Sequence, residues 1–289
     1  MIKSPSAIAL GFFDGVHLAH QKIIKAAVDH AKKNNLLPIA LSFDASPMEV
    51  LCPEKVRYIT TSAEKKKIIE DMGARVEFLP MSAEFLSMSP EDFIENILIK
   101  RYNIKYAVCG YDYHFGKNGS GNTKMLIEKG KRLGFDTEII ECETFLGEKI
   151  SSSRIRELIS LGEIEIANRL LRRNFSLTGT VCEGKHLGRT LGFPTANVFF
   201  NDSTVIPKKG VYKTVVIIDN MCYNAITNIG INPTVGGERL RTETYIHNFD
   251  ETLYGKEIKI EFLDFIRPEK KFENVSELKE QIIRDIKHL

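Results

Sequence analysis

Three things are scarce in this sequence: cysteine, long apolar runs and net charge. Its 289 residues include five cysteines, an odd number, which lie far apart and form no C-x-x-C pair. This disfavours a disulfide framework and a cysteine-based zinc site, and it favours reduced, mostly buried thiols. No apolar run approaches the roughly 18 residues that are needed to span a membrane. The segment Met1–Pro5 has no cleavage-like region, so we expect a cytoplasmic protein.

The charge balance bears on possible partners. The formal net charge is +2 at pH 7, so the overall electrostatics give no reason to expect a nucleic-acid or membrane partner. The short run Lys65-Lys66-Lys67 lies inside a helical pattern and is expected to form a solvated helix face. Apolar residues make up 43% and charged residues 27% of the chain, as in an ordinary globular protein. The length fits about two domains, and nothing in the sequence sets an oligomeric state.

The first part of the chain alternates between strand and helix patterns. Strands are predicted at Ala7–Phe12, Leu37–Phe43, Val76–Leu79, Tyr106–Gly110 and Glu138–Cys142. Helices are predicted between them, at His17–Lys33, at Ser62–Met72, from Ser89 onward and at Asn122–Leu133. This alternation predicts a mostly parallel, Rossmann-like sheet with helices on both faces.

The pattern changes near Arg172. From Phe175 to Phe265, short β-type runs are broken by Gly, Pro and Asn, which is typical of a small antiparallel barrel or sandwich. A last helix is expected after Asn274, which can cap it, with Glu277 three residues on as in a capping box. We therefore predict an α/β domain at 1–172, followed at 175–289 by an all-β domain, a small antiparallel β-barrel with a C-terminal helix.

The first candidate site lies where the first predicted strand meets the first helix, in the segment from Gly11 to His20. Ligands of open parallel sheets bind at this edge. Gly11 and Gly15 allow the backbone to approach a ligand closely, and a helix N-terminus favours phosphate. His17 and His20 share one face of the first helical turn, where two imidazoles can donate to phosphate oxygens. A zinc pair and a surface pair are the alternatives, and no cysteine or acidic partners with clear spacing favour zinc.

A second segment also points to an anion. The run Ile150-Ser151-Ser152-Ser153-Arg154-Ile155-Arg156 is a serine-capped helix start with two arginines in its first turn. Serines at this place need no function beyond capping. Cations at a helix N-terminus oppose the helix dipole, however, which costs a few tenths of a kcal/mol. An anion bound there would account for them.

These two segments carry a resemblance to a known family. The first resembles the H-x-G-H signature of the nucleotidyltransferase superfamily, and the second its partner motif I-S-S-T-x-I-R. The form G-x-F-D-G-V-H-x-x-H-Q is similar to the FMN adenylyltransferase module of bacterial FAD synthetases. The resemblance implies that His17 and His20 bind ATP phosphates and stabilise the transition state as FMN attacks the α-phosphorus and pyrophosphate leaves. It also implies ATP or phosphate contacts for Gly11, Phe12, Asp14, Gly15, Ser152, Ser153 and Arg156.

The segment Gly110–Lys117 resembles a further part of that module, G-x-D-F-x-F-G. The resemblance implies that Asp112 and Phe115 contact the flavin. Aromatic residues that follow a strand are more often part of the core, so a core position for Phe115 stays open.

The second candidate site falls in the predicted all-β part. Gly179–His186 nearly spells a P-loop, but it ends in histidine where that motif needs Ser or Thr, and no helix follows. Gly184–Asn197 instead resembles the G-R-x-L-G-F-P-T-A-N motif of riboflavin kinases. That resemblance implies phosphate contacts for Gly184, Gly188 and Gly192, and magnesium ligands in Thr195 and Asn197.

Glu243 stands where riboflavin kinases keep their catalytic glutamate. The resemblance implies that Glu243 takes the proton from the riboflavin 5′-hydroxyl, which attacks the γ-phosphorus of ATP. Taken alone, a strand glutamate is usually a solvated side chain. The matches run from about Ala7 to Ile286 and imply a bifunctional enzyme of FAD biosynthesis that uses riboflavin, FMN, ATP and Mg²⁺.

Five positions depart from the family pattern, namely Ala19, Ser46, Gly119, Tyr245 and Asn248. They lie close to the implied sites and leave three alternatives open. Only one of the two activities is retained, or the protein is a flavin-binding regulator without catalysis, or it is a nucleotidyltransferase for another substrate.

Overall fold

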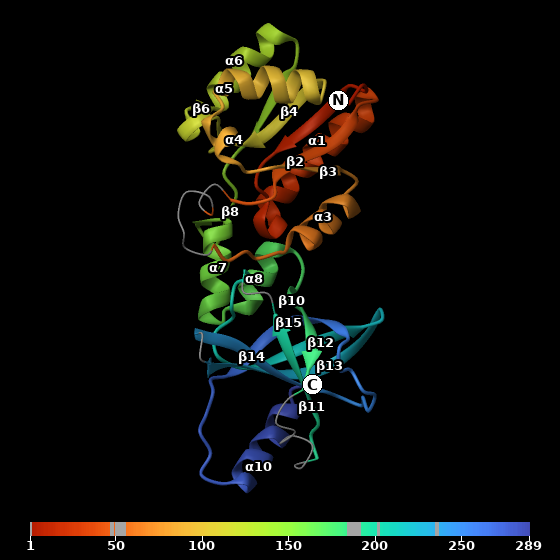
Figure 1. Ribbon diagram of the computed structural model, residues 1–289, viewed down its shortest axis with the longest axis vertical. Helices are drawn as coiled ribbons and strands as arrows, with labels where there is room; N and C mark the ends of the chain where they lie inside the picture. Colours follow the sequence, from red (N-terminus) through yellow and green to blue (C-terminus); the bar gives the residue numbers. More distant parts are fainter. Residues whose placement is uncertain (1, 47–48, 50–55, 184–191, 201–202, 235–236) are drawn as a thin grey trace. The chain divides into compact units, whose positions relative to one another are not determined.

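The fold is given by a computed structural model that describes residues 2–46, 49, 56–183, 192–200, 203–234 and 237–289, with backbone only for the strand residues among 231–241 (Figure 1). The chain divides into two compact units, Met1–Ser152 and Ser153–Leu289. None of the helices among these residues combines the length and the apolar character that a membrane crossing requires.

The first unit is built on a parallel five-stranded sheet in the order β3-β2-β1-β4-β7. Its strands are β1 (Ser6–Leu10), β2 (Leu37–Phe43), β3 (Arg75–Leu79), β4 (Ile104–Gly110) and β7 (Asp136–Ile140). The central strand β1 is buried along its whole length, because strands of parallel sheets are covered on both faces. The predicted strands and the parallel arrangement are confirmed.

Helices cover both faces of this sheet and enclose two hydrophobic clusters. One cluster joins alternate residues of β1, such as Ala7 and Ala9, to α1 (Leu18–Asn34) and α3 (Ser62–Asp71). The other joins Ile8 and Leu10 to the helices of the opposite face. Those helices are α5 (Pro90–Asp92), the π-helical η2 (Phe93–Arg101) that continues it, and α6 (Thr123–Leu133). Successive β1 side chains thus face opposite helical layers.

Short elements connect this framework. They are η1 (Asp14–Val16), α4 (Ala83–Ser87), η3 (Lys117–Gly119), and the two hairpins β5 (His114–Phe115) with β6 (Gly121–Asn122) and β8 (Thr144–Phe145) with β9 (Glu148–Lys149). Helix α3 begins with a capping box, in which the Thr61 hydroxyl accepts from the Glu64 amide and the Glu64 carboxylate accepts from the Thr61 amide. The sequence predicts that Lys65, Lys66 and Lys67 form a solvated helix face, and this is wrong for Lys65. Lys65 is 3% exposed, because it shares the inner face of α3 with Ile69, four residues on.

The second unit begins with two helices, which are followed by a closed six-stranded barrel. The helices are α7 (Ser152–Leu161), whose first residue belongs to the first unit, and α8 (Ile164–Leu171). The barrel order is β10-β11-β14-β13-β12-β15, antiparallel throughout. Its strands are β10 (Phe175–Cys182), β11 (Thr195–Phe200), β12 (Gly210–Ile218), β13 (Met221–Thr234), β14 (Gly237–Ile246) and β15 (Glu257–Arg267). The expectation of a barrel or sandwich is thereby resolved in favour of the barrel.

The barrel interior combines apolar side chains with buried hydroxyls. Phe175, Tyr212 and Phe262 are fully buried and their rings pack together. Thr227 lies between Thr214, at 2.9 Å, and Thr244, at 3.1 Å, measured between hydroxyl oxygens. These buried hydroxyls satisfy one another, as buried polar groups must. Inward and outward residues alternate along each strand, and this alternation decides which side chains form the outer face of the barrel.

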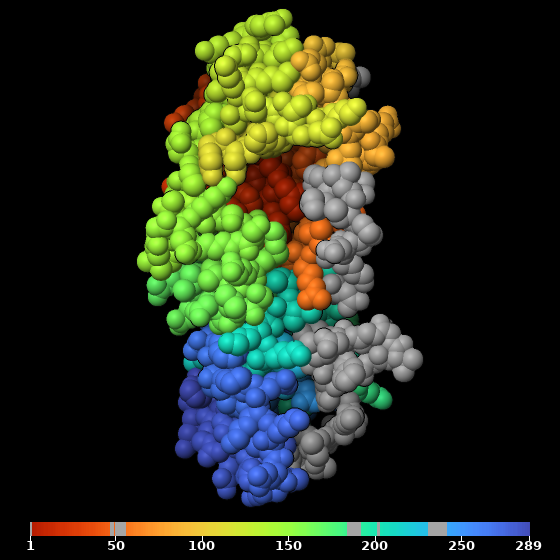
Figure 2. All heavy atoms as spheres, turned by 90° about the vertical axis from the view of Figure 1, so that its left-hand side faces the viewer, coloured from red at the N-terminus to blue at the C-terminus, as the bar shows by residue number. Residues whose placement is uncertain are grey.

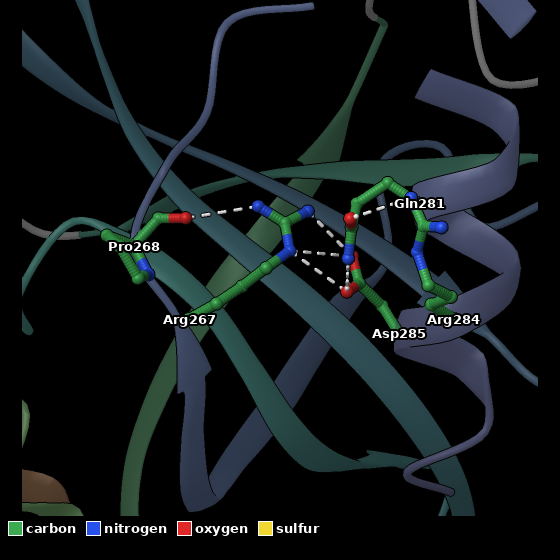
Figure 3. Close-up of polar contacts among 5 residues, drawn as sticks. All are labelled: Arg267, Pro268, Gln281, Arg284 and Asp285. Atoms are coloured by element: carbon green, nitrogen blue, oxygen red, sulfur yellow. Dashed lines mark hydrogen bonds and ion pairs between the residues drawn. The ribbon is translucent and has the colours of Figure 1, made fainter. Parts of the chain in front are cut away.

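The chain ends in α10 (Val275–Ile286), which an ion pair ties to the barrel (Figure 3). The Arg267 guanidinium at the end of β15 donates to the Asp285 carboxylate from Nε at 2.9 Å and from Nη2 at 2.7 Å. Gln281 adds a bond to the same carboxylate at 2.9 Å. Asp285 is 3% exposed, so its charge depends on these donors. The predicted cap is present, since the Asn274 side chain accepts from the Glu277 amide at 2.9 Å.

Asp285→Asn should loosen α10 from the barrel. The substitution leaves the Arg267 guanidinium without its charge partner, and removing one partner of a buried ion pair typically costs several kcal/mol, here about 2–4 because the arginine reaches solvent. Hydrogen–deuterium exchange of α10 amides should accelerate accordingly. Glu280→Gln makes the same chemical change at an exposed position of that helix and should leave exchange unchanged. Unaltered protection of α10 in Asp285→Asn would contradict the anchoring role of the pair.

Candidate active sites

A cavity of about 390 Å³ opens at the carboxyl ends of the parallel strands. Gly11 and Phe12 line it just beyond β1, Phe43 at the end of β2, and Tyr111 beyond β4. Figure 2 shows the hollow, whose red floor belongs to the N-terminal part of the chain. Parallel sheets bind ligands at this edge. The cavity therefore lies where the sequence predicts the first site.

The turn between β1 and α1 has an unusual backbone. Phe13 and Val16 have φ values of 57° and 41°, and Gly15 has 74°. A β-branched residue rarely adopts a positive φ. Both non-glycine residues are fully buried, so their packing holds them in this conformation. A Cβ on Gly11 would lie 2.6 Å from the Phe13 ring, so only glycine fits there. Strain of this kind costs of order 1–3 kcal/mol per residue and persists only where the surroundings hold it.

Hydrogen bonds from the segment before α3 hold the same turn. The buried Asp14 carboxylate accepts from the backbone amides of Ile59, at 2.9 Å, and Thr60, at 3.4 Å. The Thr60 hydroxyl accepts from the Gly15 amide at 3.2 Å. The Ser152 hydroxyl donates to the Asp14 carbonyl at 2.9 Å. Asp14, predicted to contact ATP, thus shapes the backbone of the turn.

His17 and His20 face each other across the first turn of α1. Their rings stack with centroids 3.6 Å apart and planes 17° from parallel. His17 is the N-cap of the helix, and its Nδ1 accepts from the His20 amide at 3.4 Å. A neutral His17 therefore carries its proton on Nε2. Both rings line the cavity, which brings the two predicted catalytic histidines together.

His20 has an unmet hydrogen-bonding capacity. Its Nδ1 is buried and has no partner among the described residues. Burial lowers the pKa of His20 well below 6.5, and the nearby His17 and Lys65 lower it further. An anion bound in the cavity would raise the pKa of His20 again, because it supplies a hydrogen-bond acceptor and negative charge. The pair is therefore suited to receive a phosphate.

Two further predicted flavin contacts differ in their surroundings. Asp112 lines the cavity, where Lys149 of β9 donates to its carboxylate at 2.6 Å. Lys149 also lies 5.0 Å from the centre of the Tyr111 ring. Phe115 is 6% exposed and packs against Phe93 in the hydrophobic core, with ring centroids 5.4 Å apart. Lys149 escaped the sequence analysis, since a lysine in a two-residue strand gives no pattern.

The serine-rich segment belongs partly to each unit. Ser151 and Ser152 line the cavity of the first unit. Ser153 and Arg156 belong to the second unit, where the Arg156 guanidinium donates to the Ser153 hydroxyl at 3.2 Å. The predicted phosphate contacts of Ser153 and Arg156 stay predictions.

The second site forms on the outer face of the barrel. Thr242, Thr244 and Ile246 of β14 point inward and are buried, so Glu243 points outward between them. The strand register places Glu243 opposite Asn197 of β11 on one side and opposite Asn228 of β13 on the other. Directly opposed side chains lie about 5 Å apart at Cβ. A carboxylate and two amides therefore share one face.

Thr195 completes this outer face. It lies two residues before Asn197 on β11, opposite Tyr245, so its hydroxyl is on the same side. The Tyr245 ring also contacts the Phe193 ring, with centroids 5.8 Å apart. The predicted magnesium ligands and the predicted base are thus brought together. Among the predicted phosphate-binding glycines, Gly192 has φ 87°, and Gly184 and Gly188 lie outside the described residues.

The departures from the family pattern fall at different distances from these sites. Ala19 lines the first cavity. Ser46 is buried, and its amide donates to the Tyr58 hydroxyl at 3.0 Å. Gly119 and Asn248 occupy turns with φ of 63° and 54°. Tyr245 adjoins Thr195 directly. Only Ala19 and Tyr245 therefore stand within the surfaces described above.

Comparison with known proteins assigns each half of the chain. Residues 1–154 match the FAD synthetase family, and residues 171–289 match the riboflavin kinase family. A parallel sheet with a paired-histidine cavity, followed by a barrel with an acidic and amide face, thus defines a two-part transferase. The crystal structure of a Streptococcus pneumoniae protein, described as a macrolide-efflux protein, is similar throughout. Its TM-score is 0.92 at 33% identity, covering 99% of this chain and 94% of that one.

Relatives extend the similarity over both parts together. The bifunctional riboflavin kinase/FMN adenylyltransferase of Bacillus subtilis is 38% identical over 98% of this chain and 91% of its own length. The Listeria monocytogenes protein of the same name is 36% identical over 96% and 89%, and that of Escherichia coli K12 is 32% identical over 96% and 90%. The chain belongs to the bifunctional riboflavin kinase/FMN adenylyltransferase family.

The His20 ring should stay neutral at pH values where a free histidine is charged. Nitrogen-detected NMR titration should place its pKa well below 6.5, with the signal assigned by its loss in His20→Asn. Because the folded state resists this proton, the unfolded state binds it first as the pH falls through 6.5, and the first unit loses stability there. His20→Asn should reduce that loss. A His20 ring that titrates at or above 6.5 would contradict the buried, positively flanked site.

Proposed function

We propose that the chain makes FAD in two steps at two separate sites. The barrel phosphorylates riboflavin to FMN with ATP, and the parallel-sheet domain adenylylates FMN to FAD with release of pyrophosphate. The observation that supports the proposal is that the side chains predicted to react at each site lie near one another. His17 and His20 meet in the cavity, and Glu243 lies opposite Asn197 on the barrel. We assign 1–172 to the adenylyltransferase and 175–289 to the kinase, and a cytoplasmic location stays a prediction.

At the first site, catalysis depends on positioning and on stabilising charge. The flavin phosphate attacks the α-phosphorus of ATP, a reaction in which negative charge builds on the equatorial oxygens. The unmet hydrogen-bonding capacity of His20 and the N-terminus of α1 supply donors and positive potential at this point. Ser152 contributes by fixing the Asp14 carbonyl, which keeps the turn in shape. No side chain needs to act as a nucleophile.

FMN and ATP bind the same cavity in this proposal, with Asp112 at its rim. Lys149 holds the Asp112 carboxylate in an exposed ion pair, which contributes little to stability. A flavin ring or a ribityl hydroxyl could replace that lysine as the partner of Asp112. The Lys149 ammonium would then be available to a phosphate oxygen. Phe115 would influence a bound flavin indirectly, by supporting the neighbouring Tyr113, whose ring centroid lies 5.7 Å away.

At the second site, Glu243 acts as general base. It takes the proton of the riboflavin 5′-hydroxyl, and the resulting oxygen attacks the γ-phosphorus of ATP. Its flanking amides, Asn197 and Asn228, orient the carboxylate or the substrate hydroxyl. Gly192, in a turn with φ 87°, would contact the phosphates.

Magnesium fits the oxygen donors of the barrel face. Among the described residues, no group of three or more His, Cys, Asp or Glu side chains could hold a metal ion. The Thr195 hydroxyl and the Asn197 amide oxygen share a face, and Mg²⁺ prefers a few such hard oxygens together with substrate phosphates. The ion would supply charge neutralisation to the transferred phosphoryl group. Thr195 and Asn197 would hold it beside the base.

Two substitutions should separate the activities. His20→Ala should slow FAD formation from FMN by about 10²-fold or more, as removal of a transition-state donor does, and leave FMN formation unchanged. Glu243→Gln should slow FMN formation by a similar factor and leave FAD formation unchanged. Both rates are measured by chromatographic separation of the flavins with Mg-ATP in excess.

Lys32→Met and Glu257→Gln provide controls, because both residues are exposed. Lys32 lies on α1 together with His20, and Glu257 lies on β15 of the same barrel as Glu243. Neither control should change either rate. Loss of both activities in either test variant would argue against two independent sites. A wild-type chain that forms FMN but no FAD would leave only the kinase.

A further inference from the structure

Lys65 is a buried cation directly behind the turn that carries the histidine pair. Its side chain extends from α3 to the ends of β1 and β2, and only 3% of the residue is exposed. The ammonium nitrogen donates to the Phe12 carbonyl at 3.0 Å, to the Ser42 hydroxyl at 3.2 Å and to the Phe43 carbonyl at 3.4 Å. It therefore connects two strand ends that both border the cavity.

The position is costly for a charged group. Burial lowers the pKa of Lys65 to about 8, although the carboxylates of Asp14 and Asp44 act in the opposite direction. The Phe12 and Phe78 rings, with centres 4.3 and 5.1 Å from the ammonium, offset a further part of the lost hydration. An apolar side chain of similar length would avoid this cost. Stability of the fold therefore does not explain a lysine here.

The backbone that Lys65 holds is the start of the strained turn. The Phe12 carbonyl accepts both from Lys65 and from the Ser42 hydroxyl, the latter at 2.8 Å. The next residue, Phe13, has φ 57°. Two donors on this carbonyl fix the peptide plane from which the turn departs. This peptide plane sets the direction of the turn, and the turn leads into the helical segment that carries the His17 and His20 rings.

The charge of Lys65 also reaches the histidines. It contributes to the lowered pKa of His20, after burial and after His17. The titratable groups that interact with Lys65 are thus Asp14 in the turn, Asp44 beyond β2, and His20. A phosphate bound beside the histidines would be attracted by the positive charge of Lys65. In a low-dielectric interior, such a fixed charge acts over several ångströms.

We propose that Lys65 is a positioning residue for the adenylyl transfer reaction. It ties the ends of β1 and β2 behind the turn, so that His17 and His20 are held in their stacked arrangement, and it places a fixed positive charge beneath the bound phosphates. The inference deepens the proposed function of this site and rests on it.

The test compares Lys65→Met with Lys66→Met. Lys66 is the next residue of α3 and is exposed, and its ammonium lies 3.8 Å from the Glu70 carboxylate. Lys65→Met should lower kcat for FAD formation by about 10²-fold, since small displacements of catalytic groups have effects of that size, while KM for FMN changes less than about threefold. Its thermal midpoint should match or exceed that of the wild type, a result that a merely structural lysine would not give. Riboflavin phosphorylation by the same chain should not change.

The outcomes are distinguishable. An unaltered kcat in Lys65→Met would overturn the inference, as would an equal loss in Lys66→Met. If the methionine variant unfolds, Lys65→Gln replaces it, because the amide keeps a donor for the Phe12 carbonyl without the charge. A glutamine variant with wild-type kcat would overturn the inference as well. A wild-type chain that makes no FAD from FMN would instead refute the proposed function of the site.

The wild-type pH profile gives an independent reading. The kcat/KM for FAD formation reports the groups of the free enzyme, and Lys65 loses its proton as the pH rises through about 8. The value should therefore fall above that pH, and the fall should be absent in Lys65→Met. A wild-type kcat/KM that stays level to about pH 9.5 would contradict the role of the charge.

Discussion

The first site depends on a backbone that would not hold its shape alone. Phe13 and Val16 adopt positive φ values inside the core, and such strain persists only when the surroundings determine it. Here the surroundings are the Thr60 hydroxyl, which accepts from the Gly15 amide, and the Ser42 and Lys65 side chains, which donate to the Phe12 carbonyl. The consequence is a rigid platform for the histidine pair at the strand ends. Preorganised donors of this kind do not have to rearrange when charge develops, which is how they accelerate reactions.

The two sites solve the same problem with different elements. In the proposed function each holds a triphosphate and stabilises one transferred group, the first at a helix N-terminus beside two imidazoles and the second on a barrel face. On the barrel, the register of three antiparallel strands alone brings Asn197, Glu243 and Asn228 side by side. Because each domain has its own core, substitutions in one site should not disturb the chemistry of the other. Independent folding units thus make consecutive reactions of one pathway possible in one chain.

The sequence predicted the helices and strands better than the contacts between them. Periodicity and caps located the parallel sheet, the barrel strands and the Asn274 cap, because these depend on local pattern. The barrel-or-sandwich choice depends on closure between distant strands, which local pattern does not contain. The sequence predicts Lys65 in solvent because a run of three lysines shows no inner face. Its burial depends on the packing of α3 against the strand ends, where Lys65 contacts Ser42. Lys149 was missed because its partner Asp112 lies 37 positions away in sequence.

The most direct measurement follows each phosphorus of ATP into the flavins. The wild-type chain is incubated with riboflavin, magnesium and ATP labelled at either the γ- or the α-phosphorus, and the flavins are separated. The account predicts γ-label in FMN and, carried forward, in FAD, whereas α-label appears in FAD alone. This pattern requires both a γ-transfer and an α-transfer by one protein. Absence of α-label from every flavin, or of γ-label from FMN, would contradict the assignment of two reactive sites.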